Sequence, residues 1–212
     1  MAYDLQEQES LDELKAWWEK WGNATLTAIT AVCLAFAGYN GMKWYDRHQA
    51  ENASLAYSSL QSAIAGQQEV ASVDKIVHAL IEDAGSTVYG PMGALSAAKY
   101  FETKGESAKA ETLLQWVVNE SKHAEYQTVA RLRLAGFQLD QKKYDEAIAN
   151  LKAAKPTDKQ VALIQDRLGD VYFAKNDLKA ARSAWEEAVK HPLEPSLMGF
   201  VQLKLQALPE AK

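Results

Sequence analysis

The chain has little cysteine, no cluster of positive charge and no stretch in which apolar and polar residues alternate. Its 212 residues include one cysteine, Cys33, so neither an intrachain disulfide nor a thiol pair can form. The formal net charge is −5, and no basic patch is dense enough to follow a phosphate backbone, which argues against nucleic acid as a partner. Alternation with a period of two marks half-buried strands, so its absence predicts an all-α protein.

Motifs for catalysis or metal binding are also missing. The histidines His48, His78, His123 and His191 are dispersed, and none has a second histidine three or four residues further on. Metal sites need convergent ligands. The chain contains no glycine loop for phosphates and no G-x-S-x-G motif. We therefore expect no catalytic residues, no cofactor and no metal, and a role other than that of an enzyme.

One long stretch lacks charge altogether. No Asp, Glu, Lys, Arg or His occurs between Lys20 and Lys43, and about 20 apolar helical residues can cross a hydrocarbon layer of about 30 Å. Aromatic residues flank the stretch, as they do at membrane interfaces. These candidate interfacial anchors are Trp17, Trp18, Trp21, Trp44 and Tyr45. We predict a transmembrane signal anchor at 21–41, preceded at 1–20 by a short acidic segment with an amphipathic helix.

Two other interpretations of this stretch stay open. Its large apolar side chains are few, which also suits a helix buried in a soluble core. The sequence Ala35-Phe36-Ala37 matches the small-x-small pattern of a signal-peptide cleavage site. The segment before the stretch is acidic, whereas signal peptides begin with positive charge. A membrane anchor is therefore the preferred interpretation.

Small residues form a stripe along one face of the predicted membrane helix. Such stripes let a second helix approach closely within lipid. We therefore treat the stripe as a candidate membrane helix-packing face. Its members are Ala24, Ala28, Ala31, Ala35 and Gly38.

A short pattern recurs three times in the C-terminal half. Ala110, Ala147 and Ala181 each follow a polar turn, and the spacings between them are 37 and 34 residues. A large apolar residue stands four positions after each alanine. The pattern resembles the tetratricopeptide repeat, a helix–turn–helix unit of about 34 residues. We predict tetratricopeptide-like repeats with a C-terminal capping helix at 91–212, and a helical bridge or divergent repeat at 42–90.

Stacked helix pairs present a concave face formed by the first helix of each pair. A face of mixed apolar and acidic character suits an extended, partly hydrophobic polypeptide, although several of its residues could simply pack together. No basic cluster that would clamp a terminal carboxylate is apparent. The candidate concave peptide-binding face consists of Met92, Leu95, Lys99, Leu132, Gly136, Leu139, Asp166, Asp170 and Phe173.

Several segments resemble a known bacterial family. They are Ser54-Leu55-Ala56-Tyr57 after the anchor, Leu132-Arg133-Leu134-Ala135 with Gln141-Lys142-Lys143, and the run from Ala180 to Lys190. In these segments, and in its order of anchor and repeats, the chain is similar to the YfgM-type tetratricopeptide-like ancillary subunit of the SecYEG translocon.

The resemblance implies a single-pass inner-membrane protein with a cytoplasmic N-terminus and a periplasmic repeat domain. Its implied partners are the SecYEG translocon, a membrane-anchored periplasmic chaperone of the PpiD type, exported client proteins and the lipid bilayer. The implied function is to assist the passage or folding of exported proteins by protein binding. The alternative is a regulatory adaptor whose acidic N-terminal segment docks a cytosolic partner. Orientation rests on the resemblance, because Lys15 and Lys20 on one side of the anchor balance Lys43 and Arg47 on the other.

Overall fold

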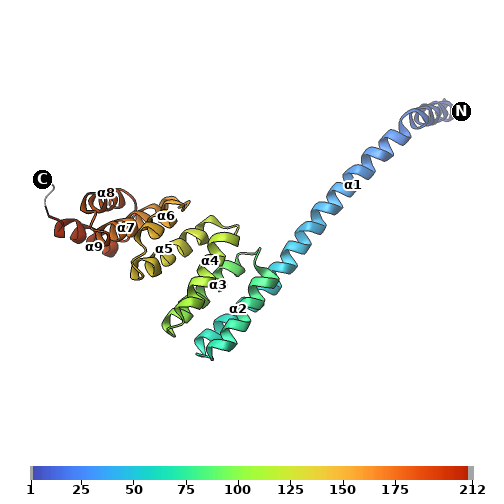
Figure 1. Cartoon of the computed structure of the whole chain (residues 1–212). Helices are drawn as coiled ribbons and strands as arrows, with labels where there is room; N and C mark the ends of the chain where they lie inside the picture. Colours follow the sequence, from blue (N-terminus) through green and yellow to red (C-terminus); the bar gives the residue numbers. More distant parts are fainter. Residues whose placement is uncertain (1, 210–212) are drawn as a thin grey trace. The chain divides into compact units, whose positions relative to one another are not determined.

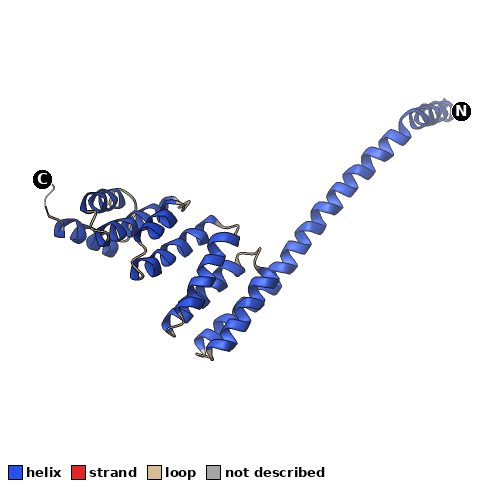
Figure 2. Cartoon of the chain, in the orientation of Figure 1, coloured by secondary structure: helices blue, strands red, loops and turns tan. Residues whose placement is uncertain are grey.

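The computed structural model describes residues 2–209, and every regular element in that range is a helix (Figures 1 and 2). The predicted all-α class is confirmed. The helices are α1 (Ala2–Ala65), α2 (Val70–Ala84), α3 (Tyr89–Thr103), α4 (Ser107–Glu120), α5 (Ala124–Asp140), α6 (Tyr144–Lys152), α7 (Asp158–Ala174), α8 (Leu178–Ala188) and α9 (Pro195–Ala207).

The chain divides between Gln49 and Ala50 into two compact units. The N-terminal unit consists of most of α1. The last part of α1 belongs to the second unit, which also contains α2 to α9. We refer to the second as the repeat unit.

In the repeat unit, α3–α4, α5–α6 and α7–α8 are the three helix pairs that the recurring alanines predict. Each pair turns at a residue with a positive φ: Gly105 at 79°, Lys142 at 58° and Asn176 at 68°. The residue after each turn donates a backbone hydrogen bond of 2.8–2.9 Å back into the first helix. This is the pattern of a Schellman cap, in which a left-handed residue ends the helix. One turn geometry therefore recurs in all three repeats.

The same turn joins α1 to α2. Gln67 has a φ of 50°, and the backbone N–H of Gln68 donates to the carbonyl of Ala63 at 3.0 Å. After this turn the buried residue Val73 takes the place of the alanine, at a spacing of 37 residues from Ala110. The end of α1 and α2 are thus built like the three predicted pairs. The repeat search missed this pair because a valine replaces the alanine.

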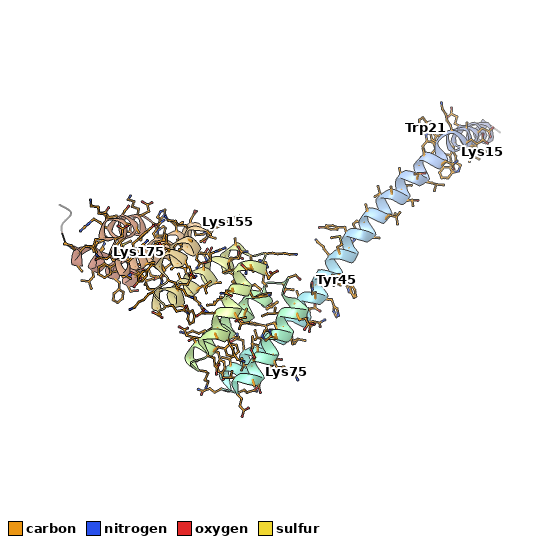
Figure 3. The ribbon with its side chains drawn as sticks, in the orientation of Figure 1. Lys15, Trp21, Tyr45, Lys75, Lys155 and Lys175 are labelled. Carbon is orange, nitrogen blue, oxygen red and sulfur yellow. The ribbon has the colours of Figure 1, made fainter. Side chains whose placement is uncertain are left out.

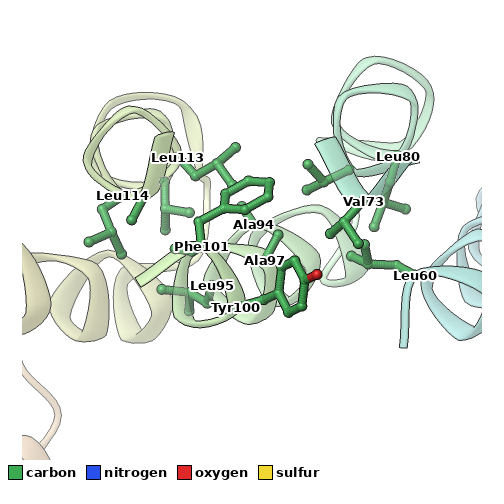
Figure 4. Close-up of a cluster of buried hydrophobic side chains, with 14 of the residues drawn as sticks. Leu60, Val73, Leu80, Ala94, Leu95, Ala97, Tyr100, Phe101, Leu113 and Leu114 are labelled. Atoms are coloured by element: carbon green, nitrogen blue, oxygen red, sulfur yellow. The ribbon is translucent and has the colours of Figure 1, made fainter. Parts of the chain in front are cut away.

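The core of the repeat unit runs between successive pairs. Leu60 of α1, Leu80 of α2, Phe101 of α3 and Leu114 of α4 belong to one cluster of buried side chains (Figure 4). All four are almost completely removed from solvent. Apolar burial contributes roughly 25 cal/mol per Å², and an aromatic ring buries about 150–250 Å². Phe101 is therefore one of the main contributors to the stability of this unit.

The third repeat depends on a glycine. A Cβ atom at Gly169 of α7 would lie 2.3 Å from the indole nitrogen of Trp185 on α8. That nitrogen donates to the carbonyl of Asp166 at 3.1 Å. Only a residue without a side chain lets the indole approach the backbone of α7 this closely. The glycine of the repeat pattern is therefore a packing requirement.

The second repeat replaces an aromatic residue of the pattern by Gln138. A polar clasp forms at this position: Asn150 of α6 donates to the carbonyl of Arg131 at 2.9 Å and to Gln138 at 3.4 Å. Arg131 in turn donates to the side chain of Asn150 at 3.0 Å. Partial burial lowers the pKa of Arg131. Hydrogen bonds thus join α5 to α6 where the other repeats use aromatic packing.

Candidate functional site

Two surfaces stand out, and the first is the apolar part of α1. Among the described residues, α1 is the helix that is long and apolar enough to cross a membrane. Its large apolar side chains point outward: Val32, Leu34 and Phe36 are each 68% exposed. A buried core helix would hide these side chains. Their exposure favours a membrane span over the soluble-core interpretation, because lipid can cover them.

Polar groups within the apolar stretch bond to the backbone of their own helix. Thr25 donates to the carbonyl of Trp21 at 3.0 Å, and Thr27 donates to that of Asn23 at 2.7 Å. Near the other end, Asn40 donates to the carbonyl of Phe36 at 2.9 Å. A polar group in hydrocarbon is costly unless it is hydrogen-bonded. These internal bonds let the stretch enter lipid without unpaired hydroxyl or amide donors at these three positions.

The five predicted interfacial anchors lie at both ends of the stretch and are all exposed (Trp21 and Tyr45 are labelled in Figure 3). Trp18 packs over Gly22, where a Cβ would lie 3.1 Å from the indole ring. At the other end, the ring of Trp44 stacks on His48 with centroids 5.6 Å apart. Indole rings at these two levels suit the two interfaces of a bilayer.

The predicted helix-packing stripe lies on the exposed surface of α1 in its entirety. A Cβ at Gly38 would meet nothing within 4 Å. The stripe is therefore accessible to another helix. Its members are Ala24, Ala28, Ala31, Ala35 and Gly38.

The second surface is a groove of about 400 Å³ formed by the first helices of the three pairs, α3, α5 and α7. We call it the A-helix groove. Four of the nine residues predicted for the concave face line it. The complete lining is Lys99, Glu102, Leu132, Arg133, Gly136, Phe137, Leu139, Asp140 and Arg167.

The other residues predicted for the first repeat lie differently. The side chain of Leu95 is buried, and its carbonyl accepts a hydrogen bond of 2.7 Å from Arg133. Met92 is not among the lining residues, whereas Glu102 is. With a spacing of 37 residues, Glu102 corresponds to Leu139 of the second repeat. The register of the first repeat is therefore one helical turn further along than the sequence alignment placed it.

The two predicted aspartates of the third repeat are already paired. Lys204 of α9 donates to Asp166 and to Asp170, each at 2.7 Å. The ammonium group also lies 5.7 Å from the centre of the Trp185 ring. Phe173 remains half exposed beside the same ring, at a centroid distance of 5.9 Å. The capping helix therefore covers the acidic end of the predicted face.

Burial and charge act together on this cluster. Burial raises the pKa of Asp170, the hydrogen bond from Lys204 opposes the rise, and the charge of Asp166 adds to it. For Lys204, burial disfavours the charged form, but the hydrogen bonds to both carboxylates raise its pKa above the ordinary value. Lys204 thus stays protonated in a partly buried position because two carboxylates surround it.

Sequence reasoning missed the basic side of the A-helix groove. Lys99, Arg133 and Arg167 come from three different helices and line one groove. They are far apart in the sequence and form no visible basic cluster. The signal that could have found two of them is register, because Arg133 and Arg167 are 34 residues apart, and the same spacing separates the turn residues Lys142 and Asn176.

A second hollow, of about 540 Å³, lies between α6, α7 and α8 and has Leu151, Ile164 and Tyr172 in its lining. It contains none of the predicted site residues. Among residues 2–209, no three His, Cys, Asp or Glu side chains gather closely enough to hold a metal ion. The arrangement of the A-helix groove suits the binding of polypeptide, since charged and apolar side chains alternate around it.

Comparison with known proteins points in one direction. Residues 15–210 match the family model described as a tetratricopeptide repeat-like domain. A curated protein of Escherichia coli (strain K12) named "Ancillary SecYEG translocon subunit" is 28% identical over 203 residues, which cover 95% of this chain and 96% of that protein.

Two further relatives carry the same name. The protein of Haemophilus influenzae is 28% identical over 193 residues, covering 89% of this chain and 91% of its own length. That of Neisseria gonorrhoeae is 25% identical over 209 residues, covering 98% of this chain and 100% of its own. The likeness extends over the apolar part of α1 as well as the repeats.

Proposed function

The chain belongs to the YfgM-type family of tetratricopeptide repeat-like proteins, and on this basis we propose that it is a membrane-anchored ancillary subunit of the SecYEG translocon that acts by binding other proteins. The observation that carries the proposal is the near full-length match to relatives of that name. It is supported by the combination, in one chain, of an exposed apolar helix and a repeat unit with a groove.

In this proposal, residues 21–41 are the anchor, residues 1–20 lie in the cytoplasm and the repeats lie in the periplasm. The last part of α1 and α2 form the divergent repeat, as their shared turn and buried register support. The protein places the A-helix groove next to the exit of the translocon. There it binds exported chains or a membrane-anchored chaperone of the PpiD type.

The small-residue stripe offers a contact within the membrane. A double substitution, Ala28→Leu with Ala31→Leu, places two bulky side chains on the stripe. Cys33→Leu with Ala37→Leu adds similar bulk to the opposite face of the same helix and serves as the matched control. If the stripe packs against a translocon helix, the first variant loses co-purification with SecYEG from solubilised membranes and the control keeps it. Equal co-purification of both variants reduces the helix to a tether.

Topology is tested with single cysteines in a Cys33→Ser background. A membrane-impermeant maleimide added to cells with a permeabilised outer membrane should label Glu106→Cys and leave Gln8→Cys unlabelled. The reverse pattern would contradict the proposed orientation.

The adaptor alternative makes a different demand on the chain. Deleting residues 2–16 removes most of the acidic segment and leaves the apolar stretch in place. The translocon subunit should keep its association with SecYEG after this deletion. An adaptor that docks a cytosolic partner would lose its function.

A further inference from the structure

A basic side chain recurs at one register on three successive helices of the repeat unit. Arg133 on α5, Arg167 on α7 and Lys204 on α9 are separated by 34 and 37 residues. Each of them lies against the preceding first helix: Arg133 bonds to α3, Arg167 lines the groove with α5, and Lys204 bonds to α7. We refer to these three residues as the cation row.

Two members of the cation row have partners. Arg133 donates to the carbonyl of Leu95 at 2.7 Å. Lys204 donates to the carboxylates of Asp166 and Asp170, each at 2.7 Å. The structure thus contains one complete example of a cation of this row held by carboxylates on the preceding helix.

Arg167 has no such partner on α5. The positions that correspond to Asp166 and Asp170, 34 residues earlier, are Leu132 and Gly136, and both line the groove. A Cβ at Gly136 would meet nothing within 4 Å, so the space is open. Among the described side chains, no carboxylate lies within ion-pair distance of Arg167. The nearest relevant charge is Asp170 on its own helix, which is bonded to Lys204.

The other charges of the groove leave a positive balance. Lys99 pairs with Glu102 on its own helix at 3.4 Å. Arg133, Arg167 and Asp140 remain in the lining. Apolar contact is available from Leu132 and Leu139. An arginine presents a planar set of donors that matches a carboxylate, so the groove is complementary to an acidic side chain flanked by aliphatic ones.

We propose that the A-helix groove recognises partner polypeptides through a carboxylate, which binds Arg167 in the way that Asp166 and Asp170 bind Lys204. Aliphatic residues on either side of that carboxylate pack on Leu132 and Leu139. The inference rests on the proposed protein-binding function and adds to it the chemical class of the ligand: an acidic residue within a short apolar segment.

The test uses full-length protein in nanodiscs and two fluorescein-labelled, end-blocked peptides, Gly-Ser-Leu-Leu-Glu-Leu-Leu-Ser-Gly and the same peptide with Gln in place of Glu. Fluorescence polarisation measures binding. A charge-assisted hydrogen bond is worth enough to change affinity by at least about tenfold, so the Glu peptide should bind at least about tenfold more tightly. Arg167→Gln should remove the difference, whereas Lys122→Gln on an exposed residue away from the groove should preserve it.

A second variant works by supplying the missing carboxylate. Gly136→Asp places an acid at the position of Asp170, where the structure has room. It should pair with Arg167, raise the thermal unfolding temperature and abolish preference for the Glu peptide. Gly136→Asn has nearly the same shape without the charge and should retain the preference. Circular dichroism of each variant verifies that the helices remain folded.

The outcomes separate the two proposals. If the protein co-purifies with SecYEG but the two peptides bind equally or not at all, the inference about Arg167 is wrong and the translocon role stands. If the Glu peptide is preferred but SecYEG does not co-purify, the groove chemistry stands and the translocon role fails.

Discussion

One helix, α1, passes through two kinds of surroundings, and its apolar residues are arranged differently in each. Before the division at Gln49, the large side chains Leu34 and Phe36 are each 68% exposed. After it, Leu60 is fully buried against α2 and α3. Both segments are helical, so local propensity does not explain the contrast. The difference shows that the first segment is built for an apolar solvent and the second for contact with neighbouring helices.

The sharpest test of this contrast compares two phenylalanines. Phe101 is fully buried in the repeat unit, and Phe36 is exposed on α1. Truncating a buried phenylalanine costs about 3–5 kcal/mol, because apolar contacts are lost and a cavity remains. We expect Phe101→Ala to lower the free energy of unfolding of the repeat unit by that amount and Phe36→Ala to leave it unchanged. Chemical denaturation of both variants in nanodiscs measures this, and equal losses would contradict it.

A charge on α1 tests the same contrast from the lipid side. Val32 lies near the middle of the apolar stretch and is exposed. A lysine at the centre of a membrane helix costs about 2.5–3.5 kcal/mol of insertion free energy. Val32→Lys should therefore shift protein from the membrane fraction to the soluble or degraded fraction. The control is Leu203→Lys on an exposed site of α9, which should fractionate like the unmodified protein.

Two glycines extend the comparison to backbone packing. A side chain at Gly169 would collide with Trp185, whereas one at Gly38 has open space. Overpacking costs about 1–3 kcal/mol. Gly169→Ala should lower the midpoint of thermal unfolding of the repeat unit, and Gly38→Ala should not. An unchanged midpoint for Gly169→Ala would mean that the indole can move aside at no cost.

The smallest expected effect concerns pH. The pKa of Lys204 is raised above its ordinary value of 10.5, so its ammonium group contributes stability that is fully present below pH 10.5 and is lost as the pH rises through the raised pKa. The stability of the unmodified protein should therefore fall more steeply above pH 10.5 than that of Lys204→Met. Parallel profiles in alkaline denaturation experiments would show that the cluster with Asp166 and Asp170 does not act through charge.

Much of the fold could be predicted from the sequence, because its signals are local. The charge-free stretch and the recurring alanines follow directly from the order of residues. The divergent repeat was harder to recognise because Val73 replaces the alanine, and its identity is visible only in the turn at Gln67. Local pattern is sufficient where each repeat obeys the same rule, and it fails where one position is substituted.

The candidate site could be predicted only in part, because it depends on contacts between repeats. Periodicity placed Leu132, Gly136 and Leu139 on the groove. It could not show that Lys204 would reach back to cover Asp166, since nothing in the sequence fixes where the last helix packs.

The central claim is that the apolar surface of α1 lies in lipid while the repeat unit lies in water. Cys33 tests it directly, because it is the only cysteine of the chain and lies exposed within the apolar stretch. A membrane-impermeant maleimide should leave Cys33 unlabelled in intact proteoliposomes and label it after detergent or denaturant is added. An added Glu106→Cys in the outward-facing repeat unit should be labelled in both conditions. Labelling of Cys33 in intact proteoliposomes at the rate of Glu106→Cys would contradict the claim.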